Sequence, residues 1–363
     1  MRLFKKDSDR DENELRYKVF SVLSFLFLSF FLISCSANSN IKLRSSPYWG
    51  SPINWINPDS LGTYCYGGCI DEKIGMLYTK KGGFIDTGHL MESMDRTKCS
   101  YDVIRKNLIL ELSDFRFKLT EPATYAVHVG YPFDWRQKNK PEKEKIIDDV
   151  SIALGQVIAH RSTIWHESIT WYGWSCMAIF PEKPSSFSWE DIYSDLLGSK
   201  IGAEALRTGG EFEVTANQVM RRRIEELSPV SIKEAKRAAS TINGRWYSAL
   251  FYPMIDMKKR NFDVGFNGYI TPWLVPGFST EDIQLCAAPS LDSASRAGFT
   301  FTVEVDPGSV QGRRLAMIAG KNRVELDDDL QTIVEYIRHK AVEEKGYEVD
   351  KPNARNSWYI RDI

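Results

Sequence analysis

Apolar residues recur at helical spacing through the middle of the chain. The segment 141–174 opens with a proline and acidic residues, which is typical of a helix start. At about 100° per residue, six of its apolar positions fall within one third of the helical circumference: Ile146, Ile147, Val150, Leu154, Val157 and Ile164. The pattern predicts a long amphipathic helix, on which His160 and Glu167 align to within about 20°.

Alternation of apolar and polar residues predicts strands on both sides of this helix. In 73–90 we expect a strand, a turn at 80–83 and a second short element that ends in His89. Further strands are expected in 107–120, in 125–132 and at 299–305.

Capping signals predict further helices, over 213–227, 231–242 and 327–345. A shorter helix is expected within SSFSWEDIYSDLLGSKIG, at 185–202. There Ser188 is followed three residues later by Asp191, which is the S-x-x-D start signal, and Gly198 stands where the helix would end. We therefore interpret Asp191 as a helix-capping residue.

These elements predict an α+β fold, with one main domain that has a helical middle and a small number of strands on either side. Residues 35–60 are rich in Asn, Ser and Pro and are expected to form an acylated cysteine and tether. Residues 61–363 are expected to form a single globular domain, which is long enough to bury a large core.

The chain begins with a charged stretch and an apolar run. Arg16 and Lys18 precede VFSVLSFLFLSFFLI at 19–33, which is 15 residues long. A helix needs roughly 20 apolar residues to span a bilayer. The run is shorter than that, so it predicts a secretory signal peptide over residues 1–34.

The end of this leader resembles the bacterial lipobox, in which the cysteine is acylated and becomes the new amino terminus: Leu32, Ile33, Ser34 and Cys35. This resemblance implies a lipid-anchored protein of the cell envelope, with a membrane as its partner through the lipid attached to Cys35. Ser36 after the cysteine implies sorting to the outer membrane, facing the periplasm. The alternative is an uncleaved signal anchor with an incidental cysteine.

Charge and motifs exclude several function classes. The 47 basic and 48 acidic residues are interspersed and give a net charge of −1, so no basic face for nucleic acid is expected. The chain contains neither a G-x-x-x-x-G-K-[ST] phosphate loop nor a G-x-S-x-G elbow. Nucleotide chemistry and a serine nucleophile of that type are therefore unsupported.

Five cysteines follow Cys35, an odd number for an oxidising compartment: Cys65, Cys69, Cys99, Cys176 and Cys286. At most two bridges can form among them. Cys65 and Cys69 each have Cys99 or a more distant cysteine as a possible partner. The alternative for this C-x3-C pair is a zinc site, which would need two further ligands.

Histidines and carboxylates supply the candidate chemistry. Asp86 and His89 are three residues apart and would point the same way on a helical turn. With ligands from the WHESITWYGW segment at 165–174 they would form a set suited to zinc with an open position for water. The candidate metal ligands are His89, His160 and His166, and the candidate catalytic carboxylates are Asp86 and Glu167. Such a metal centre predicts a metal-dependent hydrolase, which would act on an envelope component.

Three aromatic residues of this segment are candidates for substrate binding: Trp171, Tyr172 and Trp174. The segment is not the H-E-x-x-H of helical zinc proteases, because Thr170 stands where the second histidine belongs. A straight helix also cannot aim three side chains at one ion here, since His166 points more than a quarter turn away from His160 and Glu167. The hydrolase hypothesis requires segment 86–89 to meet segment 166–167.

Two alternatives stay open. His166 and Glu167 can form a surface pair or a hydrogen-bonded tie to a neighbouring loop. The whole chain can also be a non-enzymatic envelope scaffold, or a lipoprotein that binds a glycan, a lipid or a protein through its aromatic residues.

Four phrases together resemble one known family: YTKKGGFIDTGHL (78–90), WHESITWYGW (165–174), FSWEDIYSDLLG (187–198) and KRNFDVGFNGYITPWLVP (259–276). The chain resembles the uncharacterised bacterial envelope lipoproteins catalogued as domain of unknown function 4056. This resemblance implies location and fold kinship and carries no activity. Members tend to place a cysteine pair near the start of the domain, whereas Cys65 and Cys69 are separated here by three residues.

Overall fold

The computed structural model describes residues 40–44, 49, 52–175, 182–251, 254–279 and 282–345. These residues belong to one compact unit that begins at Asn40. The predicted signal peptide, Cys35 and Cys176 lie outside the described residues. In the part of the chain that is described, no helix is both long and apolar enough to cross a bilayer.

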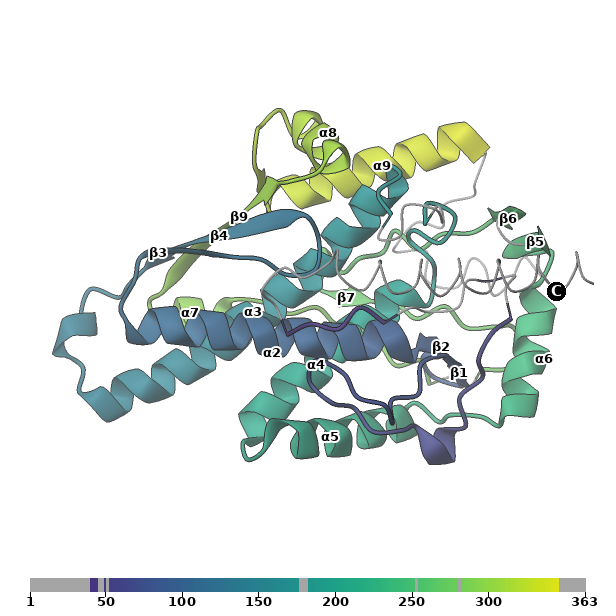
Figure 1. Ribbon diagram of the computed structural model, residues 1–363, viewed down its shortest axis with the longest axis horizontal. Helices are drawn as coiled ribbons and strands as arrows, with labels where there is room; N and C mark the ends of the chain where they lie inside the picture. Colours follow the sequence, from purple (N-terminus) through teal and green to yellow (C-terminus); the bar gives the residue numbers. More distant parts are fainter. Residues whose placement is uncertain are drawn as a thin grey trace, which may run out of the picture. The chain divides into compact units, whose positions relative to one another are not determined.

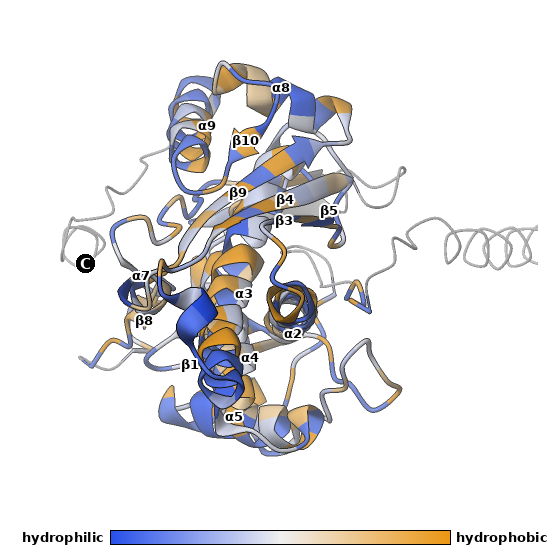
Figure 2. Cartoon of the chain, turned by 90° about the vertical axis from the view of Figure 1, so that its left-hand side faces the viewer, coloured by the Kyte–Doolittle hydropathy of each residue, from blue (hydrophilic) through white to orange (hydrophobic). Residues whose placement is uncertain are grey.

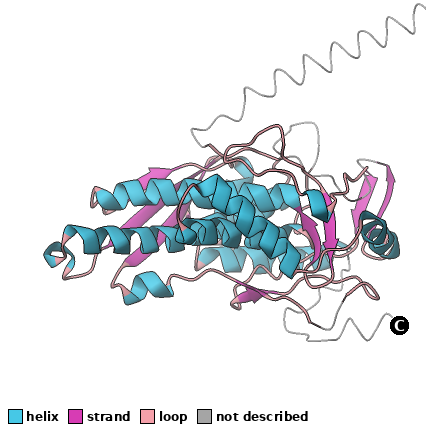
Figure 3. Ribbon diagram, turned by 90° about the horizontal axis from the view of Figure 1, so that it is seen from below, coloured by secondary structure: helices cyan, strands magenta, loops and turns pink. Residues whose placement is uncertain are grey.

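Three long helices pack against one another at the centre of the unit (Figure 1): α2 (Thr87–Ile109), α3 (Lys140–Trp171) and α4 (Asp191–Thr208). α3 starts near the predicted proline, where Asn139 Oδ1 accepts a hydrogen bond of 3.0 Å from the Glu142 N–H. It then continues unbroken for 32 residues. Figure 3 shows that helices make up the larger part of the described fold.

Glycines allow these helices to approach closely. A Cβ atom on Gly198 of α4 would lie 2.1 Å from the Leu90 carbonyl oxygen of α2. A Cβ on Gly155 of α3 would lie 3.0 Å from the Tyr101 backbone nitrogen, also on α2. The absence of side chains at these two positions therefore sets the distances of α3 and α4 from α2.

A four-stranded antiparallel sheet packs with the helices and has the strand order β10-β9-β4-β3. Its strands are β3 (Asp114–Phe117), β4 (Ala123–Gly130), β9 (Thr300–Pro307) and β10 (Val324–Glu325). In β3 buried and exposed residues alternate, as expected for a strand with one face on the core.

The other strands form two-stranded antiparallel pairs: β1 (Met76–Thr79) with β2 (Gly83–Asp86), β5 (Tyr247–Phe251) with β6 (Met254–Met257), and β7 (Tyr269–Ile270) with β8 (Cys286–Ala287). The remaining helices are α5 (Phe212–Glu226), α6 (Ile232–Ile242), α7 (Asp292–Arg296), α8 (Val310–Ile318) and α9 (Asp329–Lys345), with short 3₁₀ turns η1 (Pro58–Ser60) and η2 (Trp135–Gln137). Because β2 leads directly into α2, the β1–β2 hairpin fixes where α2 begins.

Two apolar clusters form the core. The larger lies among α2, α3, α4 and the four-stranded sheet, and the smaller is rich in aromatic rings, with Trp49, Trp189, Trp246 and Trp273. Figure 2 shows apolar residues concentrated along α3, and mainly hydrophilic residues along α5. The α+β prediction is confirmed, as are the helices predicted over 213–227, 231–242 and 327–345, to within two residues at each end.

Several local predictions are wrong. Asp191 does not act as a helix cap through the S-x-x-D signal, because α4 begins at Asp191 and its N-cap is Glu190, which makes no side-chain capping bond. Gly198 does not end that helix, which continues to Thr208, because the glycine serves the close approach to α2. The strand expected over 107–120 is shorter, since residues 107–109 still belong to α2.

The tether predicted over residues 35–60 is also corrected for its described part. Arg44 is buried and forms ion pairs with Glu72 at 2.6 Å and Asp95 at 2.8 Å. Trp49 is buried in the smaller apolar cluster. The domain therefore includes residues well before the predicted boundary at residue 61.

The cysteine predictions are settled for the described residues. Cys65 and Cys69 are bonded to each other, so neither pairs with Cys99 and neither is a thiolate ligand for zinc. Cys99 and Cys286 are buried and free.

Candidate functional site

Asp86 and His89 are placed by the junction of β2 and α2. Asp86 is the N-cap of α2, and its Oδ1 accepts hydrogen bonds from the N–H groups of Gly88 at 2.7 Å and His89 at 3.2 Å. A carboxylate is the preferred kind of cap at this position because it satisfies free N–H groups of the first turn. Asp86 and His89 therefore lie on a helical turn, as their spacing suggested, but the element does not end at His89, which is in the first turn of α2.

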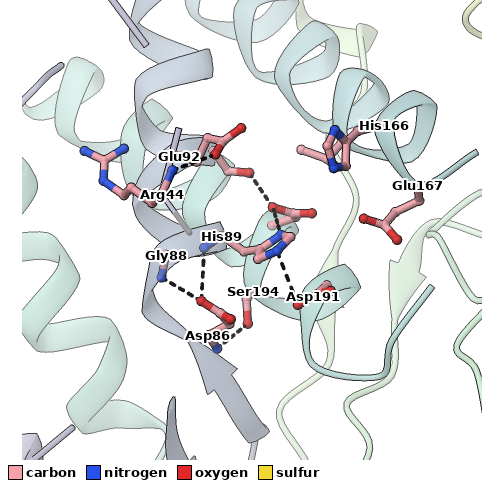
Figure 4. A network of polar contacts seen from close by, with 12 residues as sticks. Arg44, Asp86, Gly88, His89, Glu92, His166, Glu167, Asp191 and Ser194 are labelled. Atoms are coloured by element: carbon pink, nitrogen blue, oxygen red, sulfur yellow. Dashed lines mark hydrogen bonds and ion pairs between the residues drawn. The ribbon is translucent and has the colours of Figure 1, made fainter. Parts of the chain in front are cut away.

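Helix α4 brings two further carboxylates to the imidazole of His89 (Figure 4). Asp191 Oδ1 lies 3.5 Å from Nε2, and Asp195 Oδ1 lies 3.5 Å from Nδ1. The two aspartates are four residues apart and so share one face of α4. Ser194 Oγ accepts a bond of 2.9 Å from the Asp86 N–H, and Ser93 Oγ donates one of 2.9 Å to Asp195. These bonds tie α4 to β2 and α2.

Glu167 completes the cluster from α3. Two sets of side chains have ligand atoms within 4.8 Å of one another: Asp86, His89 and Asp191, and His89, Glu167 and Asp195. They are the sets of this kind among the described residues, and both contain His89. We call these five residues the His89 cluster. The segments 86–89 and 166–167 therefore meet, as the hydrolase hypothesis requires.

The His89 cluster concentrates several buried carboxyls around one imidazole. Burial raises the pKa of Asp191 well above its usual range, and the neighbouring carboxyls of Glu190, Glu167 and Asp86 add to this. Burial also raises the pKa of Glu167, although His166 and His89 counteract it. Four carboxyls face one imidazole, so protons or a metal ion must balance their charge.

The charge of His89 shows the same imbalance. Burial alone lowers the pKa of His89, but Asp191, Asp195 and Asp86 outweigh it, and the pKa lies well above its usual value. Glu190, next to the cluster, accepts a bond of 2.6 Å from Trp49 Nε1, and burial raises its pKa to about 7. One imidazole with several carboxylates is a donor set for a divalent cation. The structure thus shows an acidic and histidine cluster able to hold a metal.

The other two predicted histidine ligands do not join the cluster. His160 aligns with Glu167 around α3, but seven residues correspond to about 10 Å along a helix. Its Nε2 instead lies 3.0 Å from the Val264 carbonyl oxygen, and burial lowers its pKa to about 3. His166 Nδ1 lies 3.3 Å from Glu121 Oε1. Neither histidine belongs to the two sets of ligand atoms that contain His89, so of the residues predicted on α3 only Glu167 joins the cluster.

His166 belongs to a second polar centre next to the His89 cluster. Arg96 is almost fully buried and donates to Glu121 Oε2 at 3.0 Å and to Glu92 Oε1 at 2.7 Å. Burial by itself raises the pKa of Glu121, but Arg96 and His166 hold it far below its usual range. In Figure 4, Glu92, His166 and Glu167 lie around His89. The alternative of a tie to a neighbouring loop thus describes His166 well.

The three aromatic residues predicted to bind substrate lie in different surroundings. Trp171 is buried, with Lys183 Nζ 4.8 Å and the Arg260 guanidinium 4.9 Å from its ring centroid, so it serves packing. Tyr172 lies beside Tyr336, and burial raises its pKa to about 12. Trp174 stands edge-on to His166, with ring centroids 5.5 Å apart. Trp174 alone of the three contacts a polar group next to the cluster.

Sequence reasoning missed Asp191 and Asp195 as site residues. The first was interpreted as a cap, and the second was not singled out. A signal was present, because the two acids lie four residues apart in a helix whose first nine residues, 191–199, are all buried. Charged side chains on an otherwise buried helix face seldom occur without a partner.

A family model described as protein of unknown function (DUF4056) matches residues 59–267. The chain belongs to this family. The matched region contains all five residues of the His89 cluster, so the cluster lies inside the domain that defines the family. None of the curated proteins and none of the solved structures matches the chain.

Proposed function

We propose that this chain is a lipid-anchored protein of the bacterial cell envelope whose domain is a metal-dependent hydrolase acting on an envelope component. One observation carries the catalytic part: Asp86, His89, Glu167, Asp191 and Asp195 converge from the β2–α2 junction, α3 and α4. Such a buried group of carboxyls costs stability unless protons or a cation balance its charge, and this favours a metal centre over a scaffold.

In this proposal Asp86, His89 Nε2 and Asp191 would hold the ion. Asp195 Oδ1, which lies 3.5 Å from His89 Nδ1, would then accept a hydrogen bond from the Nδ1–H group. Metal-bound histidines commonly donate their second ring nitrogen to a carboxylate in this way, which fixes the ring and its tautomer. The bond from Ser93 to Asp195 holds that carboxylate in place.

Glu167 is the general base of this centre. A bound divalent cation lowers the pKa of a coordinated water, to about 7 in zinc enzymes, and a neighbouring carboxylate takes its proton. Glu167 lies within the second set with His89 and is buried, which raises its pKa toward the range where a base works best. Zinc and manganese both suit one imidazole with carboxylates, and metal analysis distinguishes them.

The proposed location in the cell envelope is supported by the N-terminal leader with Cys35 and by the disulfide. The apolar run before Cys35 and its lipobox-like ending favour acylation and anchoring in the outer membrane. The Cys65–Cys69 disulfide supports an oxidising compartment such as the periplasm.

The test of the metal centre is metal content by mass spectrometry of the full-length chain, purified in detergent without chelator. We expect near-stoichiometric zinc or manganese in the wild type, and affinity at least about tenfold weaker in His89→Gln and Asp191→Asn. Glu204→Gln is the matched control, because it removes the same charge from α4 on a residue that pairs with Arg223 outside the cluster. A wild-type chain that binds neither ion when titrated would end the proposal.

A further inference from the structure

Four exposed apolar side chains gather at the end of α2 that lies farthest from the His89 cluster. Ile109 and Leu110 end the helix, Leu112 follows in the next loop, and Phe133 lies in the loop before η2. Leu110 is 59% exposed and Phe133 is 102% exposed. We call these four residues the apolar tip. In Figure 1, α2 ends and α3 begins at the left-hand end of the fold.

The two loops of the apolar tip are bonded to each other. Tyr131 Oη donates to the Leu112 carbonyl oxygen at 3.0 Å, and Trp135 Nε1 donates to Glu111 Oε1 at 3.2 Å. Glu111 has a φ of 52°, a left-handed conformation that is costly for a residue other than glycine. The chain reverses there, with exposed Leu110 and Leu112 on either side. The loop that carries Phe133 is therefore joined by hydrogen bonds to the turn that carries Leu110 and Leu112.

The charges around the apolar tip suit an anionic surface. Residues 105–112 and 131–143 contain six basic and three acidic side chains. Lysines neutralise the acids closest to the tip: Lys143 pairs with Glu111 at 2.7 Å, and Lys138 with Asp134 at 2.7 Å. Lys106 and Arg136 are exposed and have no such pairing among the described residues. Lys106 and Arg136 therefore leave positive charge around the apolar tip.

We propose that the apolar tip inserts into the headgroup region of an anionic phospholipid bilayer. Aromatic and branched aliphatic side chains enter this interfacial region, while lysine and arginine are attracted to its anionic headgroups. Four exposed side chains form a patch much smaller than a stable protein interface, which has about 20 residues or more on each side. This contact would give a lipid-anchored domain a second attachment point.

The position of the tip along α2 separates this proposal from the metal centre. His89 is in the first turn of α2 and Ile109 is its last residue, which corresponds to about 30 Å along the helix. The tip shares no residue with the His89 cluster, so the proposal does not rest on hydrolase activity. Metal content serves as a control for the folding of tip variants.

The test places a fluorescent amino acid at position 133 of the full-length chain, reconstituted in vesicles of phosphatidylethanolamine and phosphatidylglycerol with brominated acyl chains. Bromine quenches only a fluorophore that enters the bilayer. We expect emission at 133 to fall about twofold or more relative to unbrominated vesicles. The matched controls replace Ile70 and Met317, which are also exposed and apolar, and whose emission should not change.

A second arm tests the charge. The double variant Lys106→Glu/Arg136→Glu, or vesicles without phosphatidylglycerol, should reduce the quenching at position 133. Quenching at 133 no greater than at 70 and 317 would overturn the proposal, and so would a photo-crosslinker at 133 that captures protein rather than lipid. Quenching that is insensitive to both charge changes would overturn the anionic requirement.

Discussion

Arg96 lies on α2 with its guanidinium buried between carboxylates from two segments. Glu92 is one turn before it on the same helix, and Glu121 belongs to the loop between β3 and β4. A buried charge of this kind is stable only while its partners remain, because the protein interior does not solvate it. His166, the residue that the sequence predicted as a ligand, adds to this pair and does not form a centre of its own.

Removing one partner should therefore destabilise the domain strongly. We expect Arg96→Met and Glu121→Gln each to lower the free energy of unfolding by about 3–5 kcal/mol, and the double variant to lose less than the sum. Urea denaturation monitored by tryptophan fluorescence measures this. Arg105→Met is the control, because Arg105 and Asp148 form a partly exposed pair that should contribute less than about 1 kcal/mol. Strictly additive losses would contradict the coupling.

Asp263 should make stability depend on pH. Burial raises its pKa to about 6, although the Thr271 N–H donates to its Oδ2 at 3.2 Å. The folded state thus binds the proton more tightly than the unfolded state, where the pKa is about 3.9. The stabilisation from protonated Asp263 is fully present below about pH 4 and is lost as the pH rises through about 6.

We expect Asp263→Asn to flatten this part of the pH profile, since asparagine keeps an acceptor for the Thr271 N–H and does not titrate. Relative to the wild type, the free energy of unfolding of the variant should rise by up to about 3 kcal/mol as the pH increases from 4 to 7. Thermal unfolding across this pH range measures the difference. Curves that stay parallel would show that Asp263 is not responsible.

At the scale of elements, the packing of α4 on α2 decides whether the His89 cluster exists. The sequence predicted the helices α3, α5, α6 and α9 well, because apolar spacing and end signals are local properties. It predicted α4 poorly, since a helix buried along much of its length shows no polar face, and Gly198 suggested an end. The same glycine is required by a contact that only the packed helices reveal.

Gly198→Ala should disturb this contact and the cluster together. Its Cβ would lie 2.1 Å from backbone of α2, whereas a Cβ at Gly202, one turn further along α4, would first meet the Thr97 side chain at 3.0 Å. We expect Gly198→Ala to lower the free energy of unfolding by about 1–3 kcal/mol and the metal affinity about tenfold. Gly202→Ala should lower both quantities by less. Calorimetric metal titration and urea denaturation measure the two effects. Equal effects of both substitutions would contradict the close-approach argument.

At the scale of the whole molecule, the N-terminal segment belongs to the domain. Arg44 joins Glu72 and Asp95, and Trp49 joins the aromatic cluster next to Glu190. Few residues therefore remain between Cys35 and the packed chain, which would keep an acylated domain close to its membrane.

Acylation itself is tested by Cys35→Ala. We expect unprocessed precursor that no longer incorporates labelled fatty acid, because a lipobox without cysteine offers no thiol for the lipid. Labelled palmitate in growing cells, followed by gel analysis of the purified chain, measures this. Cys286→Ala is the control, since that thiol is buried and its loss should leave labelling unchanged. Label that persists in Cys35→Ala would overturn lipid anchoring at this position.

The sequence by itself determined the fold class, most helix positions, the family and three members of the His89 cluster: Asp86, His89 and Glu167. Periodicity, capping and short motifs depend on neighbours along the chain, so they can be recognised without a structure. Only the tertiary structure decided that Asp191 and Asp195 meet His89, about 100 residues earlier, and that His160 and His166 do not. Side chains from α2, α3 and α4 converge because of how closely and at what height the helices pack, and no local pattern contains that information.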